Sequence, residues 1–329
     1  MAGVSIATVS RVLNRRPDVA EETRELVMQY VREQGYVANP SARGLAQQRT
    51  GLVAITVPVV QAEYFNTIVA GAAEALYERD ARLVLCPTLH QHDREVSLLE
   101  RVMHGTTDGA LLILPEESNE ELLRVRESGF PFVVIDNTYP LDDAIPIVGA
   151  AHWSGARLAT DHLLSLGHRR IAAVTGHHTW VASSDRLAGF QTALIQAGVS
   201  TSPPVYEGDF LVESGFAAAR EFLSLPEPPT AVFAFNDNMA IGILQAAREM
   251  GVDIPGDLSV IGFDDVDLGK ALTPALTTVR QPLQEMGRAA SSLLFRLLDG
   301  QRVDVTRVEL STRLIVRSST APPKKRPGA

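Results

Sequence analysis

The sequence contains one cysteine and no apolar run long enough to cross a bilayer. A single cysteine cannot form a disulfide framework, so we expect a reducing compartment and interpret Cys86 as a small buried hydrophobe. The first five residues have neither the basic nor the apolar segment of a secretory signal. These absences argue against a secreted protein and a membrane protein, and they predict a cytoplasmic location.

Patterns that mark common enzyme sites are also absent. The chain has no phosphate loop of the Gly-x-x-x-x-Gly-Lys type and no Gly-x-Ser-x-Gly elbow. Histidines occur close together at His90 and His92 and at His177 and His178, but His90-Gln91-His92 lacks a matching set of acids or cysteines. We therefore expect no catalytic residue, no cofactor and no metal site, and we do not expect an enzyme.

Positive charge is scarce overall but unevenly distributed. The formal net charge of the 329 residues is −9. Seven arginines against five acids give residues 1–50 a charge of +2, which leaves −11 for the remainder. This asymmetry is of the kind expected when one end of a chain faces phosphate. The basic end of the chain, 322–329, is interpreted as a disordered tail, with a role at nucleic acid as the alternative.

From Gly51 onward, short apolar runs alternate with segments of helical period, which is typical of βαβ units and parallel sheets. Two successive sets of units predict an α/β fold of two doubly wound parallel-sheet lobes, with a ligand crevice between the lobes. The expected strands are 52–57, 83–86, 109–114, 132–136, 171–175, 205–207, 231–235, 259–263, 307–310 and 313–316. The expected helices lie near 66–79, 93–104, 118–128, 153–166, 184–198, 212–224, 238–250 and 283–298.

The first 35 residues predict two helices and no strand. Ser5 is a suitable N-cap for a helix over 6–13, whose apolar side would hold Ile6, Val9, Val12 and Leu13. Its outer side would hold Ala7, Thr8, Ser10 and Arg11, a small polar surface that suits the major groove of DNA. The second helix, 21–34, would bury Leu26, Val27, Tyr30 and Val31 and end at Gly35. The segment 39–46 starts with an N-cap asparagine and a proline, and it is either a linker or a helix that orders only on DNA.

Residues 2–14, Ala-Gly-Val-Ser-Ile-Ala-Thr-Val-Ser-Arg-Val-Leu-Asn, resemble the turn and recognition helix of the LacI family of bacterial transcription regulators. Residues 39–45 resemble its hinge helix, and the similarity continues almost to Ala321. The resemblance implies base reading by Ile6, Ala7 and Arg11, a phosphate contact by Asn14, and insertion of Leu45 into the minor groove. The candidate DNA-binding residues are Ser5, Ile6, Ala7, Thr8, Ser10, Arg11, Asn14, Asn39, Ala42, Arg43 and Leu45.

The resemblance also implies a division of the chain into a helix-turn-helix head and a core similar to periplasmic binding proteins. Family members have a further helix before the Ala-Gly-Val-Ser turn, so we expect an incomplete all-α head that binds DNA more weakly than an N-terminally extended version. The expected parts are a head over 1–37, a hinge and linker over 38–50, a core over 51–321 and a tail over 322–329. Within the core, we expect an N-lobe over 51–149 plus 280–305 and a C-lobe over 150–279 plus 306–321.

Four segments of the second lobe, 167–172, 184–190, 235–240 and 260–265, also resemble the family. A sugar is bound by carboxylate, amide and guanidinium contacts to its hydroxyls and by an aromatic ring on its apolar face. Arg186, Asn236 and Asp264 would supply the polar contacts, and Phe65, Trp180 and Phe210 are candidate rings. The resemblance assigns Arg186, Asp264 and Phe210 to effector contact and adds Tyr64, Phe65 and Gln281. The candidate effector-binding residues are Tyr64, Phe65, Trp180, Arg186, Phe210, Asn236, Asp237, Asp264 and Gln281.

Three positions in this region leave alternatives open. Asp237 and Asp265 suit either ligand contact or the capping of a helix or turn. Where the family often has Asp-Asn, this chain has Ala151-His152, so a usual pocket acid is missing. His152 would either replace it as a hydrogen-bonding group or be exposed.

The sequence thus predicts a ligand-responsive DNA-binding regulator. Among regulators we favour a repressor, and among effectors we favour a sugar. Its partners would be operator DNA, the effector and a second copy of the chain. The effector would close the lobes and change whether the hinges order on DNA. The alternative is a cytoplasmic solute-binding protein without effective DNA binding.

Overall fold

The computed structural model describes residues 3–13, 16–34, 49–199 and 202–324, with no side chain for Ser10. The chain divides into two compact units, Met1–Gly51 and Leu52–Ala329, and each is described by itself. None of the helices in the described ranges is long and apolar enough to span a membrane.

Within its described residues, the first unit contains two helices, α1 (Ile6–Leu13) and α2 (Glu21–Glu33). Ser5 caps α1, because its Oγ accepts a hydrogen bond from the backbone N–H of Thr8 at 3.1 Å. Val12 on α1 and Val27 on α2 are each 2% exposed and form the buried centre of this unit. The predicted boundaries of α1 are confirmed, and α2 is one residue shorter than predicted.

Two predicted core positions of this unit are wrong. Ile6 is 89% exposed and Leu26 is 41% exposed, whereas Val9 and Leu13 are half-buried. Burial on α1 therefore increases toward its end, where α1 contacts α2. A helical projection alone assigns Ile6 to the same side as Val9, but it does not show how far along the helix that side is covered.

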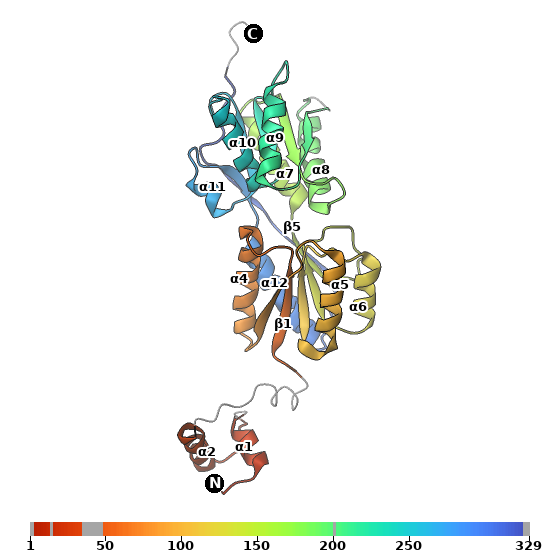
Figure 1. The fold of residues 1–329 in the computed structure, drawn as a ribbon, viewed down its shortest axis with the longest axis vertical. Coiled ribbons are helices and arrows are strands. Elements are labelled where there is room, and N and C mark those ends of the chain that lie inside the picture. The colour runs from red at the N-terminus through yellow and green to blue at the C-terminus, as the bar shows by residue number, and fades with distance from the viewer. Residues whose placement is uncertain (1–2, 14–15, 35–48, 200–201, 325–329) are drawn as a thin grey trace. The chain divides into compact units, whose positions relative to one another are not determined.

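The second unit contains two lobes, and each is built on a six-stranded sheet (Figure 1). The first-lobe sheet has the order β11-β5-β4-β3-β1-β2, and every pair in it is parallel. Its strands are β1 (Leu52–Val57), β2 (Arg82–Pro87), β3 (Gly109–Ile113), β4 (Phe132–Ile135), β5 (Ile147–Ala150) and β11 (Arg307–Leu310). Its helices are α4 (Glu63–Tyr77), α5 (His92–Arg101), the π-helical turn η1 (Val102–Thr106), α6 (Asn119–Glu127) and α12 (Leu283–Leu298).

Alternate residues of the first-lobe strands face two separate cores, as the period of two in a strand requires. Val53, Ile55 and Ile113 pack in the cluster formed with α4 and α12. Ala54, Ala110 and Leu112 pack in the cluster formed with α5 and α6. The helices accordingly cover both faces of the sheet, α4 and α12 on one and α5 and α6 on the other (Figure 1).

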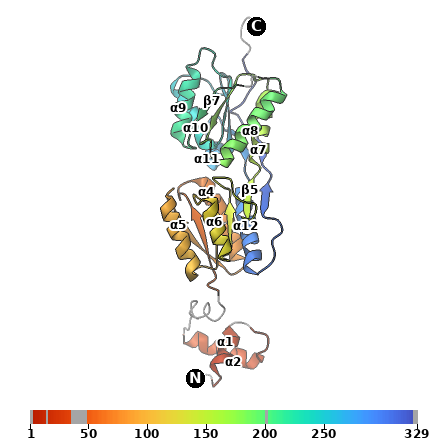
Figure 2. The ribbon, with the colours of Figure 1, turned by 90° about the vertical axis from the view of Figure 1, so that its right-hand side faces the viewer.

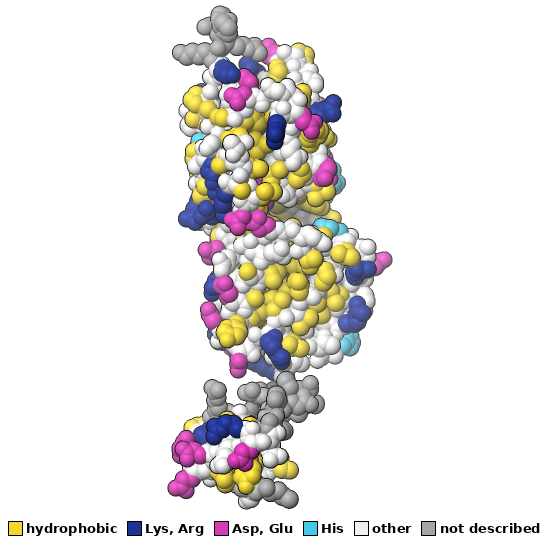
Figure 3. Space-filling view, turned by 60° about the vertical axis from the view of Figure 1, so that its left-hand side comes forward, with side chains coloured by type: hydrophobic (Ala, Val, Ile, Leu, Met, Phe, Trp, Pro, Cys, Tyr) yellow, Lys and Arg dark blue, Asp and Glu magenta, His cyan; other side chains and the backbone are white. Residues whose placement is uncertain are grey.

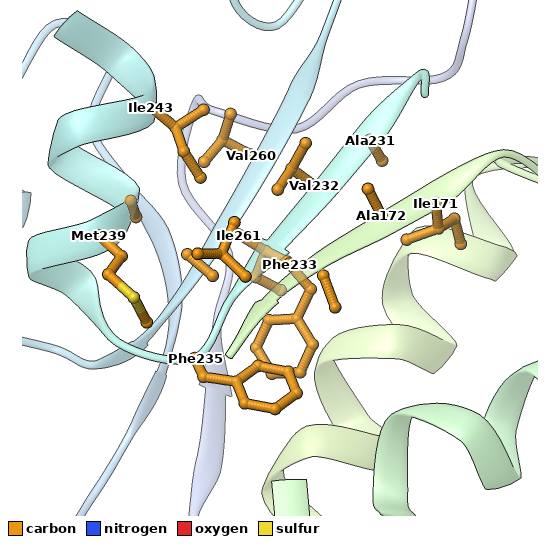
Figure 4. Packing of buried hydrophobic residues seen from close by; sticks show 14 of the residues in the cluster. Ile171, Ala172, Ala231, Val232, Phe233, Phe235, Met239, Ile243, Val260 and Ile261 are labelled. Atoms are coloured by element: carbon orange, nitrogen blue, oxygen red, sulfur yellow. The ribbon is translucent and has the colours of Figure 1, made fainter. Parts of the chain in front are cut away.

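The second-lobe sheet has the order β12-β10-β9-β8-β6-β7, and only β12 in it is antiparallel to its neighbour. Its strands are β6 (Ile171–Thr175), β7 (Val205–Glu207), β8 (Ala231–Ala234), β9 (Ser259–Asp264), β10 (Thr277–Arg280) and β12 (Arg313–Ile315). Its helices are α7 (His152–Ser165), α8 (Val181–Gln196), α9 (Val212–Leu223), α10 (Asp237–Glu249) and α11 (Asp267–Ala271). Phe233 and Phe235 lie side by side in its core, with Met239 of α10 nearby (Figure 4).

The chain passes between the lobes three times within the described residues, after β5, after β10 and after β11. Two of these crossovers are hydrogen-bonded to each other, because the N–H of Ala151 donates to the carbonyl of Leu310 at 2.9 Å. Figure 2, turned by 90°, shows β5 passing upward between the lobes. The predicted architecture of two doubly wound lobes is confirmed.

The structure corrects several predicted details. Strands β5 and β10 and the short helix α11 were not predicted. Strand β11 pairs in parallel with β5, so the assignment of all of 306–321 to the C-lobe is wrong at this strand. Of the predicted disordered tail, 322–329, the structure describes residues as far as Lys324, whose Nζ donates to Asp257 Oδ1 at 2.6 Å.

Candidate functional site

Strained backbone marks the strand ends that face the space between the lobes. Asp136 directly follows β4 and has φ 50°, while Asp264 ends β9 with φ 127° and Asp265 follows with φ 68°. Phe210, in the loop between β7 and α9, has φ 67°. Side chains other than glycine seldom adopt positive φ, and such positions collect at binding sites. The strained positions thus coincide with the ends of strands, where ligands bind in open α/β sheets.

A chain of polar contacts joins the two lobes. The Tyr64 hydroxyl donates to Asp136 Oδ2 at 2.5 Å, and both residues belong to the first lobe. Asp136 Oδ1 lies 3.4 Å from Nε2 of His152, the first residue of second-lobe helix α7. His152 Nδ1 in turn lies 3.2 Å from Arg186 Nη2. A continuous network, Tyr64–Asp136–His152–Arg186, therefore runs from the first lobe to the second.

The network defines the protonation of its members. Arg186 can only donate, so in its contact with His152 the ring atom Nδ1 is the acceptor, and Nε2 faces Asp136. Although burial opposes ionisation of Asp136, the nearby His152 and the hydrogen bonds from His152 and Tyr64 hold the pKa of Asp136 below its ordinary value. Burial, together with the Asp136 charge, raises the pKa of Tyr64 well above its ordinary value. Asp136 is thus the negative group at the centre of the crevice.

Asp136 is the member of this network that sequence reasoning missed. It was predicted only as the last residue of a strand, and its neighbours Tyr64 and His152 are far away in sequence. The absence of an acid at Ala151-His152 was the available signal, because a pocket that lacks one carboxylate can take another from the facing lobe. The alternative that His152 is exposed is wrong, since it is 5% exposed.

Arg186 is the predicted polar residue that is placed most centrally. It lies on α8, is 4% exposed, and donates from Nη1 to the carbonyl of Phe235. Its guanidinium carbon lies 4.0 Å from the centroid of the Phe263 ring, a cation–π contact. Arg186 Nε has no hydrogen-bond partner among the described residues. A buried donor without a partner is costly, so this atom is suited to bind an acceptor on a ligand.

Asp264 and Gln281 form a second polar pair in the crevice. Gln281 Nε2 donates to Asp264 Oδ1 at 2.6 Å, and both side chains are buried. Burial raises the pKa of Asp264 to about 7, against the opposing effect of the nearby Arg186. Gln281 Oε1 has no partner within the described part of the chain. Near neutral pH, Asp264 can accordingly either accept or donate a hydrogen bond.

The predicted aromatic residues occupy three different environments. The rings of Trp180 and Phe210 are stacked, with centroids 5.6 Å apart and planes 16° from parallel. Tyr64 contacts Phe65 edge to face at 5.2 Å, but Phe65 is 9% exposed and packs in the first-lobe core. The stacked pair is the aromatic surface beside the crevice, because Phe210 also lies 5.8 Å from the Arg186 guanidinium. Phe65 instead packs in the first-lobe core, where it contacts the Tyr64 ring edge to face.

The remaining predicted polar residues are occupied by contacts within the second lobe. Asn236 caps α10 by accepting from the N–H of Met239, and its amide donates to the carbonyl of Phe210 at 2.8 Å. Asp237 is fully buried and accepts from the Thr278 hydroxyl and from the N–H of Val266. Asp265 accepts from Arg280 and Arg317. These contacts favour the structural alternative for Asp237 and Asp265.

On the head, the exposed part of α1 matches the predicted DNA surface in part. Ile6, Ala7 and Arg11 are exposed on α1, Ser5 is exposed at its cap, and Thr8 is half-buried. Arg11 Nη1 lies 3.7 Å from Asp18 Oδ2, an exposed pair that competition by a phosphate or base can break. The other predicted positions, Asn14, Asn39, Ala42, Arg43, Leu45 and the side chain of Ser10, lie outside the described residues.

Comparisons with known proteins agree with this geometry. The family profile described as "Bacterial regulatory proteins, lacI family" matches residues 1–39, and a "Periplasmic binding protein-like domain" matches residues 160–320. The chain is 33% identical over 323 residues to the HTH-type transcriptional repressor CytR of Escherichia coli K12, covering 97% of this chain and 94% of that protein.

Two solved structures extend the similarity to the whole fold. The transcriptional regulator CelR in complex with cellobiose matches with a TM-score of 0.77 at 33% identity, covering 97% of each chain. The Lac repressor dimer bound to operator and the anti-inducer ONPF matches with a TM-score of 0.86 at 28% identity, covering 97% of this chain and 96% of that chain. Both structures include the head as well as the core.

Proposed function

This chain belongs to the LacI family of bacterial regulatory proteins, and from that premise we propose that it represses transcription as a homodimer whose operator affinity is controlled by a sugar-like effector. The family function, ligand-responsive regulation of transcription through DNA binding, applies to this chain rather than an enzymatic activity. The relatives support the proposed partners, since CelR is described with cellobiose and the Lac repressor as a dimer on operator. A role at operator DNA supports the proposal of a cytoplasmic location.

The observation that carries the effector proposal is the set of unpartnered polar atoms in the crevice. Arg186 Nε and Gln281 Oε1 lack partners among the described residues, and the Asp264 carboxylate is bonded only through Oδ1 among the contacts described. A ligand rich in hydroxyl groups satisfies a donor and acceptors at once, because each hydroxyl both donates and accepts. The stacked rings of Trp180 and Phe210 supply a flat apolar surface for one face of a sugar ring.

The same network suggests how the effector acts on the two lobes. Its longest link is the 3.4 Å contact between Asp136 and His152, and this link crosses from one lobe to the other. The N–H of Asp267 donates to Glu63 at 2.6 Å, and the N–H of Val181 donates to the carbonyl of Thr138 at 3.0 Å, so other contacts also hold the lobes together. An effector that bridges Asp136 and Arg186 would stabilise one arrangement of the lobes over another.

A surface of the first lobe supports the homodimer. Tyr77, Val84 and Leu85 are exposed apolar residues of this lobe, and Figure 3 shows apolar side chains gathered on one of its faces. Contiguous apolar patches on a protein surface commonly mark interaction sites, and a two-fold dimer buries the same patch on both subunits. Two heads would then reach two half-sites of an operator.

Replacing Asp264 by asparagine tests the effector site. A screen of sugars and nucleosides by thermal shift first identifies a ligand, because binding to the native state raises the melting temperature. Asp264→Asn keeps the bond from Gln281 but removes the charge, so ligand affinity should fall about 10- to 100-fold, equivalent to a charged hydrogen bond of about 1.5–3 kcal/mol. Titration calorimetry measures the change.

The matched control is Asp161→Asn, which alters a carboxylate on α7 that pairs with Arg157 at the surface. This variant should bind the ligand as the unaltered protein does. Arg186→Ala is the less selective variant, because Arg186 also supports the Phe235 carbonyl and the Phe263 ring. Unchanged affinity in Asp264→Asn would remove Asp264 from the proposed site.

A further inference from the structure

Three exposed side chains that the proposed function does not use lie together beside the crevice. His177 and His178 follow β6 in the loop that leads to α8, and Glu207 is the last residue of β7. Strands β6 and β7 pair in parallel with Thr175 opposite Glu207, so the end of one strand lies next to the loop that follows the other. All three side chains are exposed. The fold thus fixes two imidazoles and one carboxylate at one place.

The ligand atoms are arranged around a common point. His178 Nδ1 lies 3.0 Å from Glu207 Oε1, and His177 Nε2 lies 3.7 Å from the same oxygen. The two rings stack with centroids 4.7 Å apart, and the three ligand atoms all lie within 4.8 Å of one another. Tetrahedral coordination with bonds of 2.0–2.1 Å separates ligand atoms by about 3.4 Å, so small side-chain rotations suffice.

A second contact orients one of the ligands. His177 Nδ1 lies 2.8 Å from the Thr179 hydroxyl. The backbone N–H of Thr179 also donates to His177 Nδ1, at 3.4 Å, so Thr179 holds the ring by this nitrogen, and Nε2 lies on the side of Glu207. Metal-bound histidines usually donate their other ring N–H to such a partner. The two contacts from Thr179 therefore orient the His177 ring with Nε2 toward Glu207.

The other pair of neighbouring histidines, His90 and His92, does not share a carboxylate. His90 lies 3.5 Å from Glu116, whereas His92 lies 2.9 Å from a different carboxylate, Glu121. Within the described ranges, His177, His178 and Glu207 are the one group of three such side chains whose ligand atoms lie this close together.

We propose that His177, His178 and Glu207 bind a divalent transition metal ion of the zinc type. Two imidazoles and a carboxylate are a common ligand set for Zn²⁺, and three protein ligands leave a fourth position for water or another ligand. The ion ties the loop after β6 to the end of β7. This loop leads directly to Trp180, whose ring lies 6.2 Å from that of His177 and stacks on Phe210.

Titration of the full-length protein with Zn²⁺ tests the site, using a preparation that carries no histidine tag. Calorimetry should show one saturable equivalent, and Co²⁺ in its place should give the visible absorption of a tetrahedral complex. His177→Ala, His178→Ala and Glu207→Gln should each weaken binding by at least about 100-fold, since losing even a partner that only orients a ligand costs about 10- to 100-fold. All three side chains are exposed, so the variants should keep the melting temperature of the unaltered protein.

The matched control is His90→Ala, an exposed histidine next to a carboxylate outside the group. It should leave the Zn²⁺ affinity unchanged. The proposal is overturned if the unaltered protein shows no saturable equivalent, if the three variants bind as tightly as it does, or if His90→Ala weakens binding equally. Because the readout is metal affinity alone, the result does not depend on the effector or on DNA.

Discussion

Glu117 is a buried carboxylate of the first lobe whose environment disfavours its charge. It is 1% exposed, and neither carboxylate oxygen has a hydrogen-bond partner among the described residues. Burial raises its pKa to about 8, with a further contribution from nearby Glu95, and burial raises the pKa of Glu95 to about 7. The folded protein therefore binds more protons at these two groups than the unfolded chain does.

The direction of the pH dependence follows from these raised values. Between the ordinary value of 4.5 and about pH 8, the folded state retains protons that the unfolded chain has released. The contribution of Glu95 and Glu117 to the free energy of unfolding is thus largest near the acidic end of this range. It falls as the pH rises through about 7 and 8.

Replacing Glu117 by glutamine should remove part of the fall in the free energy of unfolding that occurs as the pH rises. At about pH 8.5, Glu117→Gln should raise the free energy of unfolding by on the order of 1–3 kcal/mol, because it removes a buried charge that lacks partners. Near pH 5, where the carboxyl is already protonated, the difference should nearly vanish. Denaturant unfolding at the two pH values measures both quantities. Exposed Glu120→Gln is the control, and an equal effect of Glu117→Gln at both pH values would contradict the assignment.

Single residues also show what the sequence could predict about the crevice. Asp264 was predicted because it directly follows an apolar strand, and ligands bind at strand ends in doubly wound folds. Arg186 was predicted because its segment resembles the family. Asp136 was not, since its role depends on Tyr64 and His152, which are brought to it from two lobes. Phe65 was predicted as a ligand contact, but it packs in the first-lobe core. Which side of a helix faces the core depends on the packing of neighbouring elements, which the sequence does not show.

At the scale of elements, α1 separates residues that fold the head from residues that face outward. Val12 is 2% exposed and Ile6 is 89% exposed on the same helix. The exposed Ile6 side chain is available for apolar contact with thymine methyl groups in the major groove. The two positions should therefore respond differently to the same substitution.

Alanine at the two positions tests this separation. Val12→Ala should destabilise the head by about 1–3 kcal/mol, because it leaves a cavity in a small core. Ile6→Ala should leave head stability unchanged and weaken specific DNA binding. Limited proteolysis and NMR spectra report on the head separately from the core. Equal destabilisation by both substitutions would show that Ile6 is part of the packed side.

The elements that the sequence failed to predict share a physical reason. Strand β5 has four residues with Gly149 inside, and β10 consists of Thr-Thr-Val-Arg, so neither forms a long apolar run. Both are strands because neighbours in a parallel sheet supply their hydrogen bonds. Strand β11 was predicted but assigned to the wrong lobe, since its pairing with β5 depends on where the crossover lies.

For the whole molecule, we propose that one chain couples the binding of a hydroxyl-rich ligand to the binding of DNA by the head. Three crossovers connect the described lobes, and the network from Tyr64 to Arg186 passes between them. A ligand that prefers one lobe arrangement changes the equilibrium between arrangements by its difference in affinity for them. Coupling of this kind between two sites is typically worth a factor of about 5–150.

The most direct test measures operator binding with and without effector. Selection from a random duplex pool with the full-length protein should enrich a two-fold symmetric site, bound at fixed salt at least about 1,000-fold more tightly than a scrambled duplex. The sugar that raises the melting temperature should change this affinity by about 5- to 150-fold. In Asp264→Asn, the same change should require a sugar concentration about 10- to 100-fold higher. No enriched site, or an affinity that the bound sugar leaves unchanged, would contradict the account.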